Sequence, residues 1–111
     1  MNGQGKNYVV SIKFDPILAV SQDPVMVIVD DSGLTVTVAV YNANQYGQGY
    51  GDKEEGLGGT FPSLTHAVAY AAATIAAFGG VLHATSDKKE WCEEVARMCR
   101  KEVYSRSHLA R

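Results

Sequence analysis

Two segments in the first half of the chain alternate apolar and polar residues, which is the period of a strand with one buried face. They span residues 8–14 and 34–41. The apolar residues that share a face are Tyr8, Val10, Ile12 and Phe14 in the first segment and Leu34, Val36, Val38 and Val40 in the second. Both segments are therefore predicted to be strands that face the core on one side.

Between these segments, residues 25–29 are apolar at every position. An unbroken apolar run of this length is typical of a strand that is covered on both faces. A polar turn, 30–33, follows, and its Gly33 can adopt a positive φ without steric cost. The sequence therefore predicts a hairpin over residues 25–41.

Helical spacing of apolar residues appears after this hairpin. It predicts a helix over residues 63–78, with Ser63 as its N-cap and Gly79-Gly80 as its end. A start at Thr60 is the alternative, because a proline follows it in the first turn.

A second helix is predicted to begin at Ser86 or Asp87 and to run to residue 104. Asp87 and Glu90 have the spacing of a capping box, with a carboxylate in place of the usual hydroxyl. Residues 81–84, between the two helices, are too few for a firm assignment and are a candidate fourth strand.

These elements have the order β-β-β-α-(β)-α and predict an α+β fold. Two helices pack on a three-stranded antiparallel sheet, to which residues 81–84 add a short fourth strand if they are extended. A chain of 111 residues suits a single domain. Residues 1–6 are polar and contain glycine, so they are predicted to be flexible. The elements are too generic to indicate a family.

Residues 42–59 are predicted to form a long loop, since they contain six glycines in eighteen positions. Its glycines at 47, 49 and 51 lack the spacing of a dinucleotide-binding motif, and the acidic residues that follow them would repel a phosphate. Tyrosines interleaved with small polar residues instead resemble the composition of an antibody contact surface. The residues predicted to contact a partner protein are Tyr41, Tyr46, Tyr50, Asp52, Glu54 and Glu55. An ordinary surface loop is the alternative.

Residues 57–86 contain no Asp, Glu, Lys or Arg, but their apolar part is too short for a membrane span. The second face of the predicted helix 63–78 carries small or half-polar side chains where a solvated helix would carry charges. This face is expected to pack against the last helix or, alternatively, against a second subunit. The candidate dimer face consists of His66, Tyr70, Ala73 and Ala77.

Charge is divided unevenly along the chain. Residues 1–56 contain three Lys and seven Asp or Glu, whereas residues 57–111 contain seven Lys or Arg and five Asp or Glu. The last helix presents either an ordinary solvated surface or a weak nucleic-acid patch. The candidate nucleic-acid contacts are Arg97, Arg100, Lys101 and Arg106.

Side chains with catalytic or metal-binding chemistry are scattered. Cys92 and Cys99 are two helical turns apart, roughly 10 Å along the axis, so they cannot form a disulfide with each other within a helix. They are predicted to be free, buried thiols. The three histidines lie far apart and match no zinc pattern. We therefore predict no cofactor, no bound metal and no enzymatic activity.

Together, these features predict a non-enzymatic protein-binding module, such as a small inhibitor or regulator. A phage protein that blocks a host defence would have this profile. A sensor for a small ligand or nucleotide is the first alternative, with residues 42–59 as a lid over a pocket beside residues 60–63. A nucleic-acid-binding module is the second. The N-terminal residues lack the apolar core of a signal peptide, so the expected location is the cytoplasm.

Overall fold

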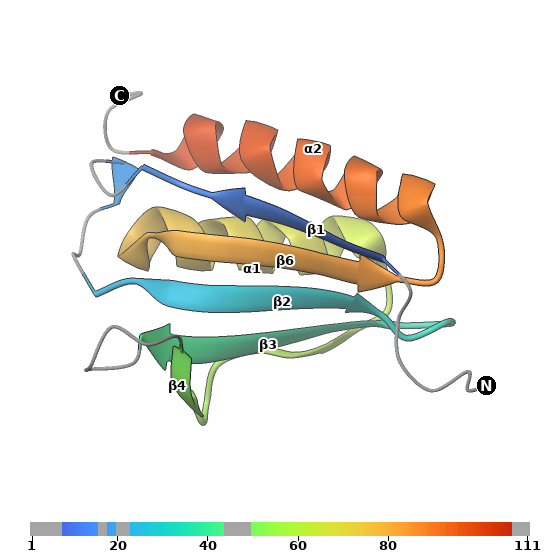
Figure 1. Cartoon of the computed structure of the whole chain (residues 1–111), viewed down its shortest axis with the longest axis horizontal. Coiled ribbons are helices and arrows are strands. Elements are labelled where there is room, and N and C mark those ends of the chain that lie inside the picture. Colours follow the sequence, from blue (N-terminus) through green and yellow to red (C-terminus); the bar gives the residue numbers. More distant parts are fainter. Residues whose placement is uncertain (1–7, 16–17, 20–22, 44–49, 108–111) are drawn as a thin grey trace.

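The structure is a computed structural model that describes residues 8–15, 18–19, 23–43 and 50–107. Residues 1–6, which were predicted to be flexible, lie outside this part. The described elements are six strands and two helices (Figure 1). In chain order they are β1 (Tyr8–Lys13), β2 (Val25–Asp31), β3 (Val36–Ala43), β4 (Tyr50–Lys53), β5 (Gly59–Phe61), α1 (Leu64–Phe78), β6 (Gly80–Ser86) and α2 (Lys89–Arg106).

The strands form one mixed sheet in the order β1-β6-β2-β3-β4, and β5 also pairs with β3. β6 runs parallel to β2, and the other pairings are antiparallel. The α+β class and the hairpin formed by β2 and β3 are confirmed. The prediction of a three-stranded antiparallel sheet is wrong, because β4, β5 and β6 join it.

β6 is the candidate fourth strand, and it lies near the middle of the sheet between β1 and β2. The paired glycines before it have separate roles. Gly79 has a φ of 78° and ends α1, whereas Gly80 pairs with Val25 at the start of β2. A side chain at Gly80 would place its Cβ 1.8 Å from the Val25 carbonyl oxygen. Glycine at position 80 therefore permits the parallel pairing of β6 with β2.

Residues 42–59 are more structured than predicted. β3 extends through Ala43, and β4 and β5 pair with its outer edge. Glycine-rich segments with little alternation carry a weak strand signal, which explains the wrong prediction. Residues 44–49 lie outside the described part of the chain.

Local signals account for the start of α1 but not of α2. The Ser63 hydroxyl accepts a hydrogen bond from the His66 backbone N–H at 3.3 Å, so the predicted N-cap is confirmed. The predicted capping box is wrong, because α2 begins at Lys89 without a side-chain cap. Instead, the backbone N–H of Lys88 donates to the Ser86 hydroxyl at 3.0 Å.

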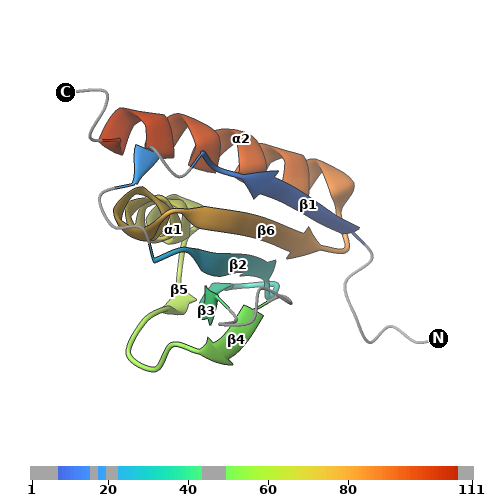
Figure 2. The same ribbon diagram turned by 60° about the vertical axis from the view of Figure 1, so that its left-hand side comes forward.

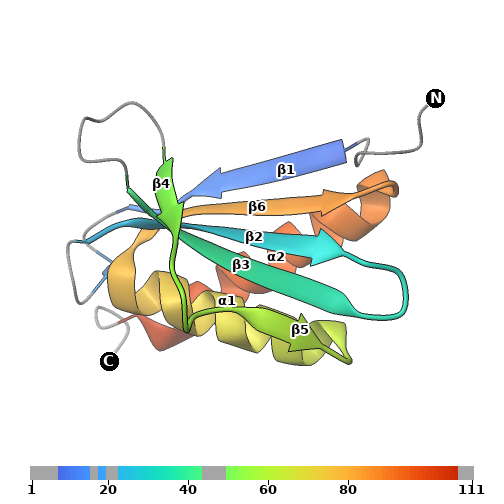
Figure 3. The same ribbon diagram turned by 90° about the horizontal axis from the view of Figure 1, so that it is seen from below.

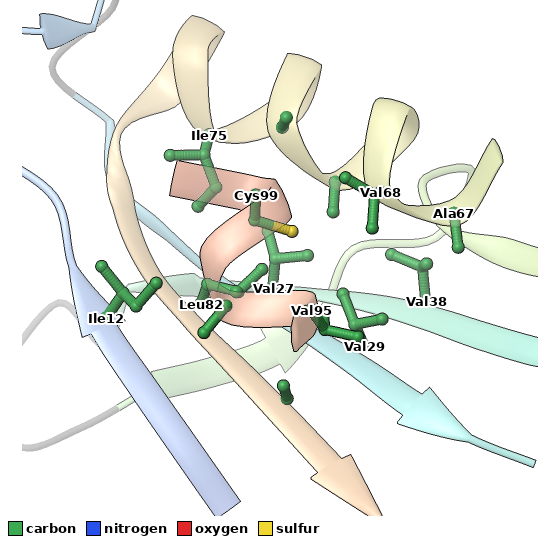
Figure 4. Packing of buried hydrophobic residues seen from close by; sticks show 14 of the residues in the cluster. Ile12, Val27, Val29, Val38, Ala67, Val68, Ile75, Leu82, Val95 and Cys99 are labelled. Carbon is green, nitrogen blue, oxygen red and sulfur yellow. The ribbon is translucent and has the colours of Figure 1, made fainter. Parts of the chain in front are cut away.

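Both helices cover the same face of the sheet (Figures 2 and 3). The core lies between the helices and this face, and Figure 4 shows its packing. Its fully buried side chains include Val27, Val29, Val38, Val40, Leu82, Ile75, Val95 and Val103. Cys92 and Cys99 belong to the same core and are free thiols, as predicted.

Candidate docking face of the sheet

Neither of the two described helices lies over the second face of the sheet (Figures 2 and 3). On β2, the side chains of Val25, Val27 and Val29 are 5%, 0% and 0% exposed, whereas Met26 and Ile28 between them are only half-buried. The prediction that this apolar run is covered on both faces is therefore wrong for the part of the chain that the structure describes. The apolar pattern of residues 25–29 did not predict that one side of this central strand remains partly accessible to solvent.

We call this second side the open face. Strand register arranges its side chains in three rows across β1, β6, β2 and β3. The rows are Val9, Thr85, Asp30 and Thr37; then Ser11, His83, Ile28 and Ala39; then Lys13, Val81, Met26 and Tyr41. The row of Lys13 continues to Lys53 on β4, which pairs with Tyr41. Met26, Ile28 and Val81 thus form a small apolar centre on β2 and β6, with Asp30 at one edge of β2 and a lysine at each end of the opposite row.

The row that contains Asp30 forms a polar boundary. The Thr85 hydroxyl donates to the Asp30 carboxylate at 2.6 Å, and the Ser32 hydroxyl donates to its other oxygen at 3.1 Å. Next to it, Asp31 accepts from the Ser86 hydroxyl at 2.7 Å and from the Gly33 backbone N–H at 3.1 Å. The two aspartates therefore stabilise the turn between β2 and β3.

His83 lies in the middle row, next to Ile28. Its Nδ1 is 2.5 Å from the Ser11 hydroxyl, a contact between residues 72 positions apart that the pairing of β1 with β6 creates. Burial lowers the pKa of the His83 imidazole from its ordinary value of 6.5. The ring is therefore mainly neutral at pH 7 and adds a weakly polar group to the apolar patch.

A serine hydroxyl beside a histidine nitrogen is also the beginning of a nucleophile–base pair. Acyl transfer further requires N–H donors directed at the oxyanion. The backbone N–H groups of Ser11 and His83 lie in the plane of the sheet, among the strand ladders, and not above the face. The contact between the two side chains is accordingly a hydrogen bond that orients the imidazole.

The structure separates the residues predicted to contact a partner. Tyr41 lies on the open face, whereas Asp52 and Glu55 are exposed on and after β4. β4 bends toward the side of the sheet away from the helices (Figure 3). Glu54 is half-buried, and its backbone N–H donates to the Val40 carbonyl at 2.7 Å. Tyr46 and the side chain of Tyr50 lie outside what the structure describes.

The residues of the candidate dimer face are also divided. The Tyr70 hydroxyl accepts from the Gly58 backbone N–H at 2.8 Å, and its ring packs on Phe61 with centroids 5.3 Å apart. Tyr70 thus holds the segment before α1 against the helix. His66 and Ala73 are exposed and Ala77 is half-buried, so a dimer contact there stays a prediction.

The basic residues of α2 are mixed with acidic ones. Arg97 forms an ion pair with Glu94 at 2.5 Å, and Arg106 forms one with Glu102 at 3.2 Å. The other two candidate nucleic-acid contacts, Arg100 and Lys101, are exposed. A surface in which acids alternate with bases attracts a phosphate backbone weakly.

A pocket of about 430 Å³ lies between the start of β2 and the end of α1. It is lined by Asp23, Pro24, Val25, Asn42, Glu54, Leu57 and Phe78. The pocket thus adjoins the end of α1, and not its start at residues 60–63, where the ligand-sensor hypothesis located a site. Its volume is within the range of small-molecule sites, so ligand binding stays an alternative prediction.

Two further classes of site are missing from the described part of the chain. There, no three His, Cys, Asp or Glu side chains are placed to hold a metal ion together. Neither α1 nor α2 has both the length and the apolar composition that crossing a membrane requires. No protein-family model, curated protein sequence or solved structure matches this chain. Arguments about function therefore depend on the residues themselves.

Proposed function

We propose that this chain is a non-enzymatic binding module that docks another protein molecule through the open face. One observation carries the proposal: neither described helix lies over the side of the sheet that carries Met26 and Ile28, and these two apolar side chains of a central strand are half-buried where their neighbours on the other side are fully buried. Exposed contiguous apolar patches on folded proteins commonly mark interaction sites.

The composition of the open face supports this proposal. A sheet face that is permanently in water normally carries polar side chains at alternate positions. Here β3 follows that rule in part, with Thr37 on this side, but β2 carries Met26 and Ile28 and β6 carries Val81. These side chains are already half-buried, so docking would add only a fraction of the roughly 1.5–3 kcal/mol that full burial of an exposed apolar side chain gives, before the costs of association.

An inhibitor or regulator, which acts by occupying a surface of its target, is the form of binding module that we propose. The cytoplasm remains the proposed location. Two free thiols that are buried and two helical turns apart are typical of proteins from a reducing compartment.

Site-specific photo-crosslinking tests the proposed function. A photo-reactive amino acid replaces Ile28 on the open face and, as the matched control, Glu93, which is exposed on α2. We expect covalent protein adducts from position 28 in cells and far fewer from position 93. Equal yields at both positions, or none at position 28, would contradict docking through this face.

A further inference from the structure

We infer that the pocket between the start of β2 and the end of α1 binds a small organic cation, an ammonium group carried on an apolar body. Its volume of about 430 Å³ admits one small molecule. Asn42, which lines it, points to the same side of β3 as the buried Val40, so the pocket lies on the helix side of the sheet. The inference thus goes beyond docking through the open face and does not depend on it.

Segments that are far apart in the sequence form the walls of the pocket. The start of β2 contributes Val25, the end of β3 contributes Asn42, the segment after β4 contributes Glu54 and Leu57, and α1 ends at Phe78. The start of β2 and the ends of β3 and α1 lie together at the left of Figure 1. The pocket is therefore a product of the tertiary fold.

Backbone hydrogen bonds fix these walls relative to one another. The Val25 N–H donates to the Gly79 carbonyl at 3.0 Å, which ties β2 to the end of α1. The Glu54 N–H donates to the Val40 carbonyl at 2.7 Å, and the Leu57 N–H donates to the Glu54 carbonyl at 3.2 Å. A pocket with walls held in this way is preformed, so a ligand loses little affinity to ordering the protein.

The apolar part of the lining favours an organic ligand over a bare metal ion. Leu57 and Phe78 are half-buried and pack against the core cluster, and Pro24 lies beside them. Hard metal ions take oxygen ligands and gain nothing from such side chains. An apolar body gains from burial against them, and the face of the Phe78 ring can also attract an ammonium group.

The charged part of the lining selects the sign of the ligand. Asp23 and Glu54 supply two carboxyl groups and Asn42 supplies an amide oxygen, whereas no Lys or Arg is among the described residues that line the pocket. Lys53, the adjacent cation in the sequence, pairs with Tyr41 in a row of the open face. Two acidic groups in a concave site with apolar walls create a negative potential, which attracts cations and repels anions.

Glu54 is the residue expected to bind the ammonium group directly. It is half-buried, and within the described chain its carboxyl group makes no hydrogen bond or ion pair. A carboxylate that has lost part of its hydration gains most from a cationic donor. Asp23 is exposed and has another interaction, so its contribution is mainly to the potential.

An NMR titration with three ligands of similar shape tests the inference. Phenethylammonium is the probe, phenethyl alcohol is its uncharged counterpart and phenylacetate is an anionic one. The amide signals of Val25, Asn42, Glu54, Leu57 and Phe78 should shift with phenethylammonium and saturate with a dissociation constant on the order of 1 mM. The alcohol should bind about tenfold more weakly, and phenylacetate should cause no saturable shift.

Two neighbouring glutamates provide matched variants. Glu54→Gln keeps the size of the side chain and the backbone bond to Val40, and it should weaken phenethylammonium binding by about tenfold through loss of one charge-assisted hydrogen bond. Glu55→Gln removes the same charge from an exposed residue that does not line the pocket and should bind like the wild type. The amide spectra verify that both variants are folded.

Several outcomes would overturn the inference: phenylacetate or the alcohol binding as tightly as phenethylammonium, saturable shifts that lie away from the pocket, no saturable shift at all, or equal effects of Glu54→Gln and Glu55→Gln. The comparison of ligands uses the wild-type chain alone, so the inference stays falsifiable if Glu54→Gln folds poorly. Crosslinking at position 28 reports on the other side of the sheet, so failure of docking and failure of ligand binding are distinguishable.

Discussion

The two faces of the sheet are formed by the same strands but differ in what covers them. On the covered face, every member of the core cluster is at most 8% exposed. On β3, composition follows this difference, because buried valines alternate with Thr37, Ala39 and Tyr41. On β2, composition does not follow this difference, because residues 25–29 are apolar on both sides of the strand. The contrast teaches that β2 has the composition of a strand with two covered faces, one of which the described chain leaves open.

The largest expected effect is the difference in thiol reactivity between the covered face and the open face of the sheet. Burial, with a smaller contribution from the Glu102 carboxylate, raises the pKa of the Cys99 thiol from 9.0 to about 12. Because the thiolate is the reactive form, the reactive fraction below pH 9 falls by roughly a thousandfold. Cys99 in the folded protein should therefore resist iodoacetamide at pH 8, as measured by mass spectrometry of the intact chain.

The variant Ile28→Cys supplies the comparison from the open face. In dilute solution its new thiol should be alkylated much faster than Cys99, although more slowly than in an unfolded peptide, because position 28 is half-buried. Denatured protein should react at all its cysteines, which verifies the reagent. Equal protection of the new thiol and of Cys99 in monomeric protein would show that the second face is covered after all.

The next effect compares two neighbours on β6 that point to opposite faces. Leu82 is 0% exposed in the core, whereas His83 lies on the open face. Leu82→Ala should lower the free energy of unfolding by about 2–5 kcal/mol, through lost burial and a residual cavity. His83→Ala should cost less than about 1.5 kcal/mol, the typical net value of its one hydrogen bond to Ser11. Urea denaturation of both variants measures the difference.

The unfolding free energies of these two variants have to be compared with each other. Costs that are similar within error would mean that the two faces of β6 are equally buried in solution.

Sequence patterns predicted most of the covered face and little of the open one. Alternation in residues 8–14 and 34–41 identified the buried positions of β1 and β3, because a period of two is strong when one side is uniformly apolar. Two of these positions are exceptions: Tyr8, at the start of β1, is 42% exposed, and Leu34 is 97% exposed in the turn between β2 and β3. Periodicity cannot distinguish the last residue of a turn from the first residue of a strand.

The open face was missed for a different reason. The run 25–29 contains no information on which side is covered, since both sides are apolar. The proximity of Ser11 and His83 depends on β1 pairing with β6, a contact between distant segments that local patterns do not encode. Among the predicted partner contacts that the structure describes, Tyr41 lies on this face because it belongs to an alternating strand, and its contact with a partner stays a prediction.

The smallest effect is the pH dependence that His83 introduces. Its folded-state pKa is lowered below 6.5, so between these two pKa values the unfolded chain binds more protons than the folded one. The free energy of unfolding should therefore rise with pH through this interval and fall as the pH drops below 6.5, levelling off beneath the folded-state pKa. The ionisable side chains nearest in the open-face rows are Lys13 and Asp30.

His83→Gln is the matched control, because the amide can still bond to Ser11 but does not titrate. Its unfolding free energy should vary less with pH between 7 and 5 than that of the wild type, since the proton uptake that distinguishes folded from unfolded chains is removed. An NMR titration of the wild type should give an imidazole midpoint for His83 below 6.5. A midpoint at or above 6.5 would show that the ring is fully solvated.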